Sequence, residues 1–439
     1  MNVKKIILFL KVSTVGVIIY LASNPESANS QSLQKPITSA KSEASVSSLN
    51  VFIQQVLETN PSIQAADANV SAVLARQHAA GQPLYNPSLT AEGQQSVDKF
   101  YAVGINQAID WTNKREAREA VGFVNLQLAE AQRMVVRQEL ITEILKALAN
   151  YQMAQEIVTL AKERTNLLQQ FVELTEKRHT NGDVARVDVD LSQLALSEAY
   201  AQEADSEVNV IQALQTLRAI TGQRAAMWPR LPDPLPDPTL TELNTDELLN
   251  RLPSIEVLNK QHLSAAARIQ VAERERYPDP TLGIQAGKEK TDEKTGNLIG
   301  VSVSIPLFVR NTYRAEVDAA HFDAIEAERK RLDTLQQSRA AIESNAQRYK
   351  ILYDNVQKWQ LISSKPLKDG IVLIERLWKA GEISATDYLV QLKQRLDSQI
   401  AGVELQSRTW QAWVDWLKAS GTIETWVQNK QKCKHRSKE

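Results

Sequence analysis

Hydrophobic and polar residues follow two different periods along this 439-residue chain. Four segments alternate between apolar and polar or small residues, two of them (88–97 and 281–290) less cleanly, and this is the period of a β-strand with two unlike faces. These segments lie at 88–97, 100–111, 281–290 and 298–307. The apolar faces of the second and fourth carry Tyr101, Val103, Ile105, Ile109, Trp111, Val301, Val303 and Ile305. Small or polar residues occupy the opposite faces, so the predicted strands have one apolar side.

Long helices are predicted between the strand pairs. From Thr112 to Thr180 the chain has no proline and a single glycine, which permits one helix about 100 Å long. Asn181 and Gly182 then favour a left-handed helix end. A second helix is expected from there to about residue 220. This pair predicts a helical hairpin of unusual length.

The second half of the chain repeats the hairpin. A long helix is predicted over 311–380 and its partner over 384–420, with kinks at Pro366 and Gly370. Because an isolated helix is only marginally stable in water, such long helices need partners of matching length.

Two shorter helices precede the strand pairs, at about 48–80 and 244–276. Within each half of the chain, the shorter helix before the strands and the one that ends the hairpin together match the long helix in length. We therefore expect the two short helices to stack end to end as a second column beside the long one.

The halves are copies of one unit, which a search for internal repeats reveals. The matching motifs are Asn60-Pro61-Ser62-Ile63 with Leu252-Pro253-Ser254-Ile255, Asn86-Pro87-Ser88-Leu89 with Asp279-Pro280-Thr281-Leu282, and Gly182-Asp183-Val184 with Gly381-Glu382-Ile383. We assign the repeats to 48–228 and 244–427, joined by a proline-rich connector at 229–243. The prolines make this connector stiff and extended.

The N-terminus has the layout of a secretory signal peptide over residues 1–30. Lys4 and Lys5 precede an apolar stretch, and small residues follow before Ser30. A retained membrane anchor is the alternative. We expect residues 31–47 to form a disordered leader and residues 428–439 a basic, flexible tail. The mature protein would then work outside the cytoplasm.

Composition excludes several classes of protein. The formal net charge is −1, and this balance argues against a nucleic-acid partner, whose phosphates require a local excess of cations. One cysteine and five scattered histidines give no metal cluster, and we expect no cofactor. The chain has no glycine-rich phosphate loop after a strand and no nucleophile elbow, so we expect it not to be an enzyme.

The strands have two possible settings. Segments of about ten residues with one apolar face are typical of the wall of an outer-membrane β-barrel, where Tyr101 and Trp111 would fit the aromatic girdles. The alternative is a small sheet of a soluble domain. Four strands are too few to close a barrel, and open strand edges are not tolerated in lipid. A barrel would therefore require several chains.

Taken together, these features resemble the TolC-type outer-membrane efflux proteins. The fragments NPSIQAADA, YNPSLTAEG, GINQAIDWTNKREAR and SVSIPLFVRNTYRAE are similar to the cobalt-zinc-cadmium resistance branch of that family. One departure is Asp110-Trp111-Thr112-Asn113, where that branch commonly has a glycine pair. The resemblance covers nearly all of residues 48–427.

The resemblance implies a mainly α-helical fold with a small β part. Three protomers would form a twelve-stranded outer-membrane barrel that continues as an α-helical coiled-coil tunnel across the periplasm. It further implies an exit duct for divalent heavy-metal cations that serves a periplasmic adaptor and an inner-membrane pump of the resistance-nodulation-division class. Lys114-Arg115 and Arg310-Asn311, where strands pass into helices, would suit lipid head groups or pairs between protomers.

The hairpin tips are the candidate gate. Asp188 and Asp387 each follow a turn glycine by six residues. The resemblance implies that Asp387 from three chains forms a carboxylate ring that selects cations, with Asp188 as a weaker candidate; a second family acid is replaced by Val390. Both aspartates could instead simply favour a helix N-terminus. The tip residues expected to contact the adaptor are Asn181, Gly182, Asp183, Gly381 and Glu382.

Two other functions stay open. Within the same class, the duct could export drugs, other organic compounds or polypeptide. From another class, the chain could be a soluble periplasmic coiled-coil adaptor. An adaptor should carry one helical hairpin within a β-rich module, whereas this chain predicts two hairpins and no such module.

Overall fold

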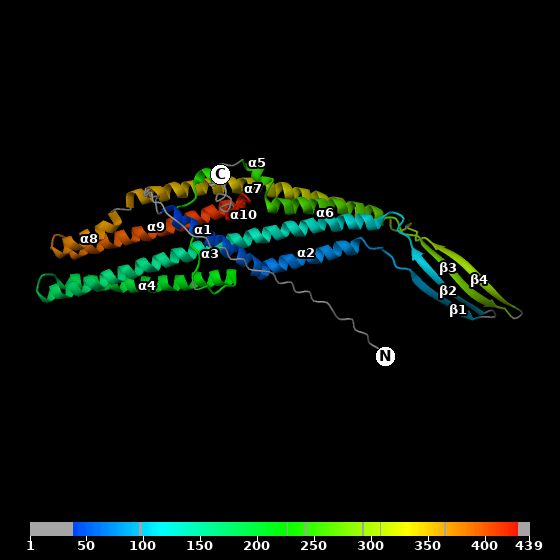
Figure 1. Ribbon diagram of the computed structural model, residues 1–439, viewed down its shortest axis with the longest axis horizontal. Coiled ribbons are helices and arrows are strands. Elements are labelled where there is room, and N and C mark those ends of the chain that lie inside the picture. Colours follow the sequence, from blue (N-terminus) through cyan, green and yellow to red (C-terminus); the bar gives the residue numbers. More distant parts are fainter. Residues whose placement is uncertain are drawn as a thin grey trace, which may run out of the picture.

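The computed structural model describes residues 38–428, except 96–98, 226, 242–243, 292–293, 308 and 364–365. The expected signal peptide and nearly all of the expected basic tail lie outside the described residues. The molecule is elongated, with a four-stranded sheet at one end and two helical hairpin tips at the other (Figure 1). The elements are α1 (Thr38–Thr59), α2 (Pro61–Ala80), β1 (Ser88–Gln95), β2 (Lys99–Ala108), α3 (Lys114–Thr180), α4 (Arg186–Thr221), η1 (Pro238–Thr241), α5 (Thr245–Leu249), α6 (Pro253–Glu275), β3 (Thr281–Lys290), β4 (Thr295–Ser304), α7 (Arg314–Ser363), α8 (Pro366–Lys379), α9 (Ala385–Ala419) and α10 (Ile423–Gln428).

The first repeat confirms the two-column prediction. Helix α2 packs along the sheet-proximal half of α3, and α4 packs along the other half (Figure 1). Where these two short helices meet, the Asn60 side-chain amide donates a 2.8 Å hydrogen bond to the Ile220 carbonyl near the end of α4. The Asn60 Oδ1 atom also accepts from the Ser62 backbone and so caps α2.

The second repeat follows the same plan. Helices α6 and α9 both pack along α7, and α8 pairs with α9 near the tip. The break expected at Pro366 is present, because α7 ends at Ser363 and α8 begins at Pro366. Gly370, the other residue expected to kink the helix, lies within α8.

The N-terminal region differs from the expectation in two ways. Helix α1 begins at Thr38, within the stretch 31–47 that was expected to form a disordered leader. Nothing in the sequence from Thr38 to Val46 stops a helix, because it contains neither proline nor glycine. The single helix expected over 48–80 is instead divided at Asn60, which caps a new helix whose first residue is Pro61.

The sheet is antiparallel throughout, in the order β1-β2-β3-β4. Its central pair, β2 and β3, joins the two repeats, with Ile105 opposite Ile284. In register with them stand Leu89 on β1 and Val301 on β4. These four apolar side chains form one row across the sheet and are all exposed.

Strand β2 is shorter than predicted. It ends at Ala108, so Ile109 and Trp111 lie in the turn that leads to α3 rather than in the strand. The cause is Asp110, whose two carboxylate oxygens accept 2.8 Å hydrogen bonds from the backbone N–H groups of Lys114 and Arg115 and start the helix. Ile305 likewise lies just after β4, which ends at Ser304 before Pro306.

The main hydrophobic core lies near the middle of the molecule, where α1, α3, α7, α9 and α10 meet. Trp413 and Trp416 are buried there with stacked rings whose centroids are 5.0 Å apart. The connector joins this core through Leu231 and Leu235 and contains the short turn η1. None of the helices in the described part of the chain is both long enough and apolar enough to cross a bilayer.

Candidate functional site

The first hairpin tip joins α3 to α4. Gly182 has φ +81°, a left-handed conformation that only glycine adopts without strain, and its neighbours Asn181 and Asp183 are exposed. The ring Nδ1 of His179 lies 2.9 Å from the Val184 carbonyl oxygen and braces the turn. This tip is a tight, ordered turn with its polar residues facing solvent.

The second tip has the same geometry. Gly381 has φ +75° and Glu382 is exposed beside it. Ser384 caps α9, because its hydroxyl oxygen accepts a 3.1 Å hydrogen bond from the Asp387 backbone N–H. The repeat therefore preserves the turn as well as the hairpin.

Both candidate gate acids lie in the first turn of a helix. The Asp387 carboxylate accepts a 2.7 Å hydrogen bond from the Ser384 hydroxyl, and the Asp188 carboxylate accepts a 3.2 Å bond from the Ala185 backbone N–H. Asp387 is exposed, whereas Asp188 is partly buried. Each acid thus stabilises a helix N-terminus, at the same end of the molecule (Figure 1).

A link between the two tips was not predicted from the sequence. The Arg178 guanidinium on α3 donates hydrogen bonds to the Trp378 carbonyl, at 3.1 Å, and to the Lys379 carbonyl at the end of α8. It also lies over the Trp378 ring, 4.8 Å from its centroid. Phe171 stacks on Tyr388 of the other hairpin at 4.6 Å. The tips are therefore joined by one cation and an aromatic cluster.

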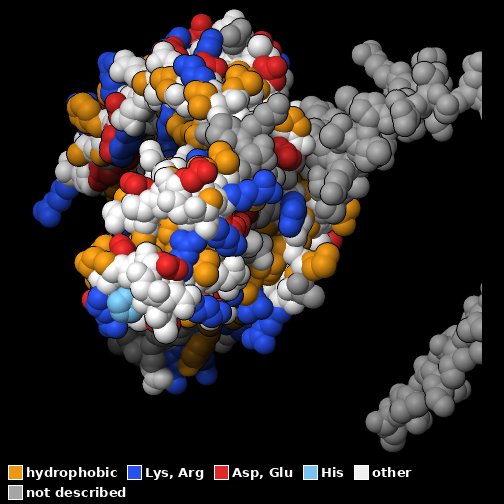
Figure 2. Space-filling view, turned by 90° about the vertical axis from the view of Figure 1, so that its left-hand side faces the viewer, with side chains coloured by type: hydrophobic (Ala, Val, Ile, Leu, Met, Phe, Trp, Pro, Cys, Tyr) orange, Lys and Arg blue, Asp and Glu red, His pale blue; other side chains and the backbone are white. Residues whose placement is uncertain are grey.

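The surface at the tip end mixes charges of both signs. Lysine and arginine side chains alternate there with acidic and apolar ones, and neither sign covers the face (Figure 2). A single protomer therefore offers no concentrated charge at this end, and any ring of like charge needs copies of the chain.

The sheet exposes the predicted apolar face. Tyr101, Val103 and Ile105 of β2 are each more than half exposed, as are Val301 and Val303 of β4 and Ile305 just after it, and Trp111 and Ile109 continue the exposed surface beyond β2. Within the described residues, β1 and β4 each have only one hydrogen-bonded neighbour. The sheet thus combines an apolar face with two open edges, an arrangement that favours association.

A buried ion pair lies where the sheet meets the helices. The Nζ of Lys114 is 2.9 Å from Oδ2 of Asp279, and the Tyr85 hydroxyl donates a 2.6 Å hydrogen bond to the same oxygen. That hydrogen bond raises the pKa of Tyr85 to about 12. The prediction that Lys114 contacts lipid head groups or another protomer is wrong, because its partner is in the same chain. The available signal was an acid at position 279 where the first repeat has Asn86.

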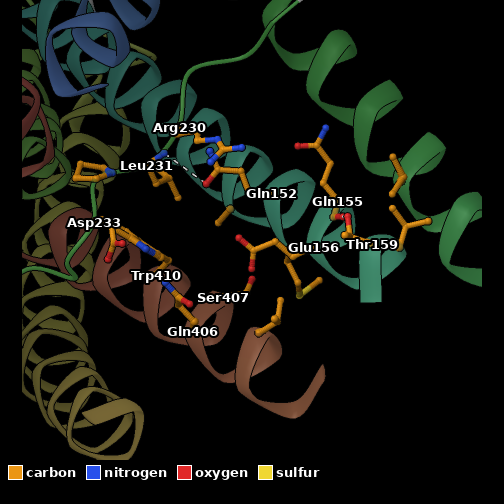
Figure 3. A pocket seen from close by; sticks show the side chains of 16 residues that line it. Gln152, Gln155, Glu156, Thr159, Arg230, Leu231, Asp233, Gln406, Ser407 and Trp410 are labelled. Carbon is orange, nitrogen blue, oxygen red and sulfur yellow. Dashed lines mark hydrogen bonds between the residues drawn. The ribbon is translucent and has the colours of Figure 1, made fainter. Parts of the chain in front are cut away.

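A cavity of about 540 Å³ lies beside the central core, away from the predicted sites (Figure 3). Its labelled side chains come from α3, the connector and α9. Gln152 holds the connector, donating to the Pro229 carbonyl at 3.2 Å and accepting from the Leu231 backbone. Desolvation raises the pKa of Glu156 above its ordinary value of 4.5, and Arg230 opposes this shift.

No cluster of three or more histidine, cysteine or acidic side chains suited to a metal ion occurs among the described residues. The polar residues singled out from the sequence lie instead at the tips and along the sheet. The arrangement is that of an elongated subunit with polar turns at one end and an exposed apolar sheet at the other.

Comparison with protein families identifies the class of protein. It belongs to the outer membrane efflux protein family, whose model matches residues 52–223 and 244–422. The two matched segments correspond to the two repeats. The family consists of efflux channels of the outer membrane, so the expectations of an outer-membrane location and of a transport protein rather than an enzyme are confirmed.

Two curated relatives are similar in sequence. The nickel-cobalt-cadmium resistance protein NccC of Alcaligenes xylosoxydans xylosoxydans is 28% identical over 314 residues, which cover 68% of each chain. The cobalt-zinc-cadmium resistance protein CzcC of Cupriavidus metallidurans is 24% identical over 231 residues, 52% of this chain and 55% of that protein. The chain is thus matched to about two thirds of one relative and just over half of the other.

Solved structures share the fold at lower identity. The Campylobacter jejuni CmeC outer membrane channel is 16% identical, with a TM-score of 0.72 over 85% of both chains. The Vibrio cholerae outer membrane protein VceC is 21% identical, with a TM-score of 0.70 over 85% of this chain and 96% of that one. CusC gives a TM-score of 0.70 at 14% identity, covering 85% and 92%. The predicted fold class, mainly helical with a small antiparallel sheet, is confirmed.

Proposed function

We propose that three copies of this chain close a twelve-stranded barrel in the outer membrane and form the exit duct of a tripartite efflux system. The observation that carries the proposal is the four-stranded sheet with an exposed apolar face and two open edges. In lipid, each open edge requires a hydrogen-bonding partner, and β4 of one copy can supply it to β1 of the next. The helices, which leave one end of the sheet, then continue the duct into the periplasm.

We propose that the cargo is divalent heavy-metal cations. Support comes from the two curated relatives, whose names describe resistance to nickel, cobalt, zinc and cadmium. The duct itself is passive, and an inner-membrane pump would supply the energy. A periplasmic adaptor would dock on the tips, at Asn181, Gly182, Asp183, Gly381 and Glu382, whose exposure is consistent with that role.

The gate proposal assigns Asp387 to a ring of three carboxylates, with Asp188 as a second candidate. The exposure of Asp387 leaves its charge available to a passing cation. Its hydrogen bond with Ser384 means that a simple deletion would also weaken the start of α9.

The decisive experiment reconstitutes the purified protein in planar bilayers and compares Asp387→Asn with Ser384→Ala. Asp387→Asn removes the charge but keeps a side-chain oxygen that can accept from the Ser384 hydroxyl, whereas Ser384→Ala removes that hydrogen bond and keeps the charge. We expect cation selectivity and block by Co²⁺ to fall in Asp387→Asn and to stay unchanged in Ser384→Ala. Equal behaviour of the two variants would contradict the gate assignment.

Cargo and assembly need separate measurements. Deletion of the gene should raise sensitivity to zinc, cobalt or cadmium; increased sensitivity to drugs alone would contradict the metal proposal. The mass of the detergent-solubilised protein should be three times that of the chain, and a native monomer in the soluble periplasmic fraction would refute the duct.

A further inference from the structure

The junction between the sheet and the helices contains an ion pair that the transport function does not require. Lys114 is the first residue of α3, in the first repeat, and Asp279 lies two residues before the start of β3, in the second repeat. Their side chains are 7% and 2% exposed and lie 2.9 Å apart. The Tyr85 hydroxyl, from the segment before β1, donates to the same Asp279 oxygen. Three segments of the chain therefore converge on one carboxylate.

Because both side chains are buried, removing either one leaves the charge of the other without compensation. Removing two charges from water is costly, and a buried carboxylate without its cation is far less stable than a neutral pair. Among the described residues, Oδ1 of Asp279 has no hydrogen-bond partner, so Lys114 and Tyr85 are its main compensation. Loss of Lys114 should therefore open the junction locally.

Other contacts cross the same junction but are exposed. Arg118 on α3 pairs with Glu275 at the end of α6 at 2.7 Å, with both side chains nearly half exposed. The Arg274 guanidinium donates a 2.6 Å hydrogen bond to the Asn113 carbonyl. These contacts join the start of α3 and the residue before it, in the first repeat, to the end of α6 in the second.

The buried cluster occurs once per chain although the unit is duplicated. The repeats align Asn86-Pro87 with Asp279-Pro280, so the first repeat has a neutral amide at the position of the acid and the second has Pro278 at the position of Tyr85. The copy of this contact at the outer edges of the sheet therefore lacks both the charge and the phenol. The junction between the two repeats, at β2 and β3, therefore differs in chemistry from the outer edges of the sheet at β1 and β4.

We propose that Lys114 and Asp279 are positioning residues that lock the two repeats together at the junction and set the direction in which the sheet leaves the helices. The lock forms within one chain and precedes any contact between chains. Its use in aligning three sheets for closure rests on the proposed function, whereas the lock itself is a property of a single chain.

Hydrogen exchange of the full-length, detergent-solubilised protein tests the lock. In Lys114→Met, amides in the peptides that cover 105–110 and 281–286, which are hydrogen-bonded where the sheet meets the junction, should exchange on the order of 100-fold faster, because a buried carboxylate loses its cation. Arg118→Met is the matched control: it removes the same charge from the same junction at an exposed pair and should leave these peptides within about twofold of the wild type.

Two further variants keep the test decisive if Lys114→Met folds poorly. Asp279→Asn has nearly the same shape and retains an acceptor for Tyr85, and the double variant Lys114→Met/Asp279→Asn removes both charges. We expect the double variant to exchange more slowly than Lys114→Met alone, with the tip peptides unchanged in all variants.

Equal exchange in Lys114→Met and Arg118→Met, or additive effects in the double variant, would overturn the proposal. Mass measurement on the same samples separates this outcome from a failure of the duct proposal. A protein that does not form trimers but shows the expected exchange pattern would refute only the duct.

Discussion

The link between the two hairpin tips yields a quantitative prediction for Arg178→Met. Methionine keeps much of the side-chain volume but removes both hydrogen bonds to the end of α8 and the cation over the Trp378 ring. The aromatic contact of Phe171 with Tyr388 stays in place. The change therefore isolates the cation's contribution.

The magnitude follows from the contacts. A hydrogen bond to a charged group contributes about 1.5 kcal/mol, and a cation over an exposed ring about 0.5–1 kcal/mol. Arg178 is only partly buried, so water replaces some of this interaction and we take about 2 kcal/mol as the net loss. That corresponds to roughly a 30-fold larger population of separated tips.

The assay is hydrogen exchange in the peptides that cover residues 377–384 and 178–185, with planar-bilayer conductance recorded in parallel. Faster exchange in both peptides and more frequent openings are expected, because the hydrogen bonds that Arg178 makes from one hairpin to the other are lost. Arg186→Met provides the control, since Arg186 pairs with Asp190 in an exposed contact within its own helix. If the two variants behave alike, the reasoning about the tip link is refuted.

Two further predictions concern stability. Leu145 is fully buried in the central core, so Leu145→Ala should lower the free energy of unfolding by about 3 kcal/mol, measured by urea titration of the far-UV circular dichroism signal; a loss under 1 kcal/mol would contradict the assignment of this core. The raised pKa of Glu156 means that its ionised form destabilises the folded state above pH 4.5. Glu156→Gln should therefore raise the melting temperature slightly at pH 7, and this gain should vanish as the pH falls below 4.5. A lower melting temperature of the variant at pH 7 would refute this sign.

Local rules in the sequence predicted the helices and strands well where one signal dominates. The long helix α3 needed only the absence of breaking residues, and the tip turns needed only Gly182 and Gly381, whose positive φ angles match the prediction. Alternation identified all four strands because a sheet with one apolar face has a period of two. The repeat then fixed the order of elements.

Predictions failed where one side chain changed the local outcome. Asp110 starts α3 by accepting two backbone hydrogen bonds and so ends β2 before Ile109, a competition that alternation cannot reveal. Lys114 and Asp279 are 165 positions apart, and Arg178 and Trp378 are 200 apart. Such pairs depend on the three-dimensional packing of the repeats, which no local pattern contains.

The central position of the core has a mechanical consequence. The tryptophan cluster, the helix that precedes Asn60 and the short C-terminal helix all pack midway along the molecule, far from both the sheet and the tips. Because this core lies at the middle of an elongated molecule, either end can bend without disrupting the core. Movement at the tips and adjustment of the sheet should therefore be mechanically independent, each resisted by the contacts at its own end, which at the tips include a second buried cluster around Phe171 and Tyr388.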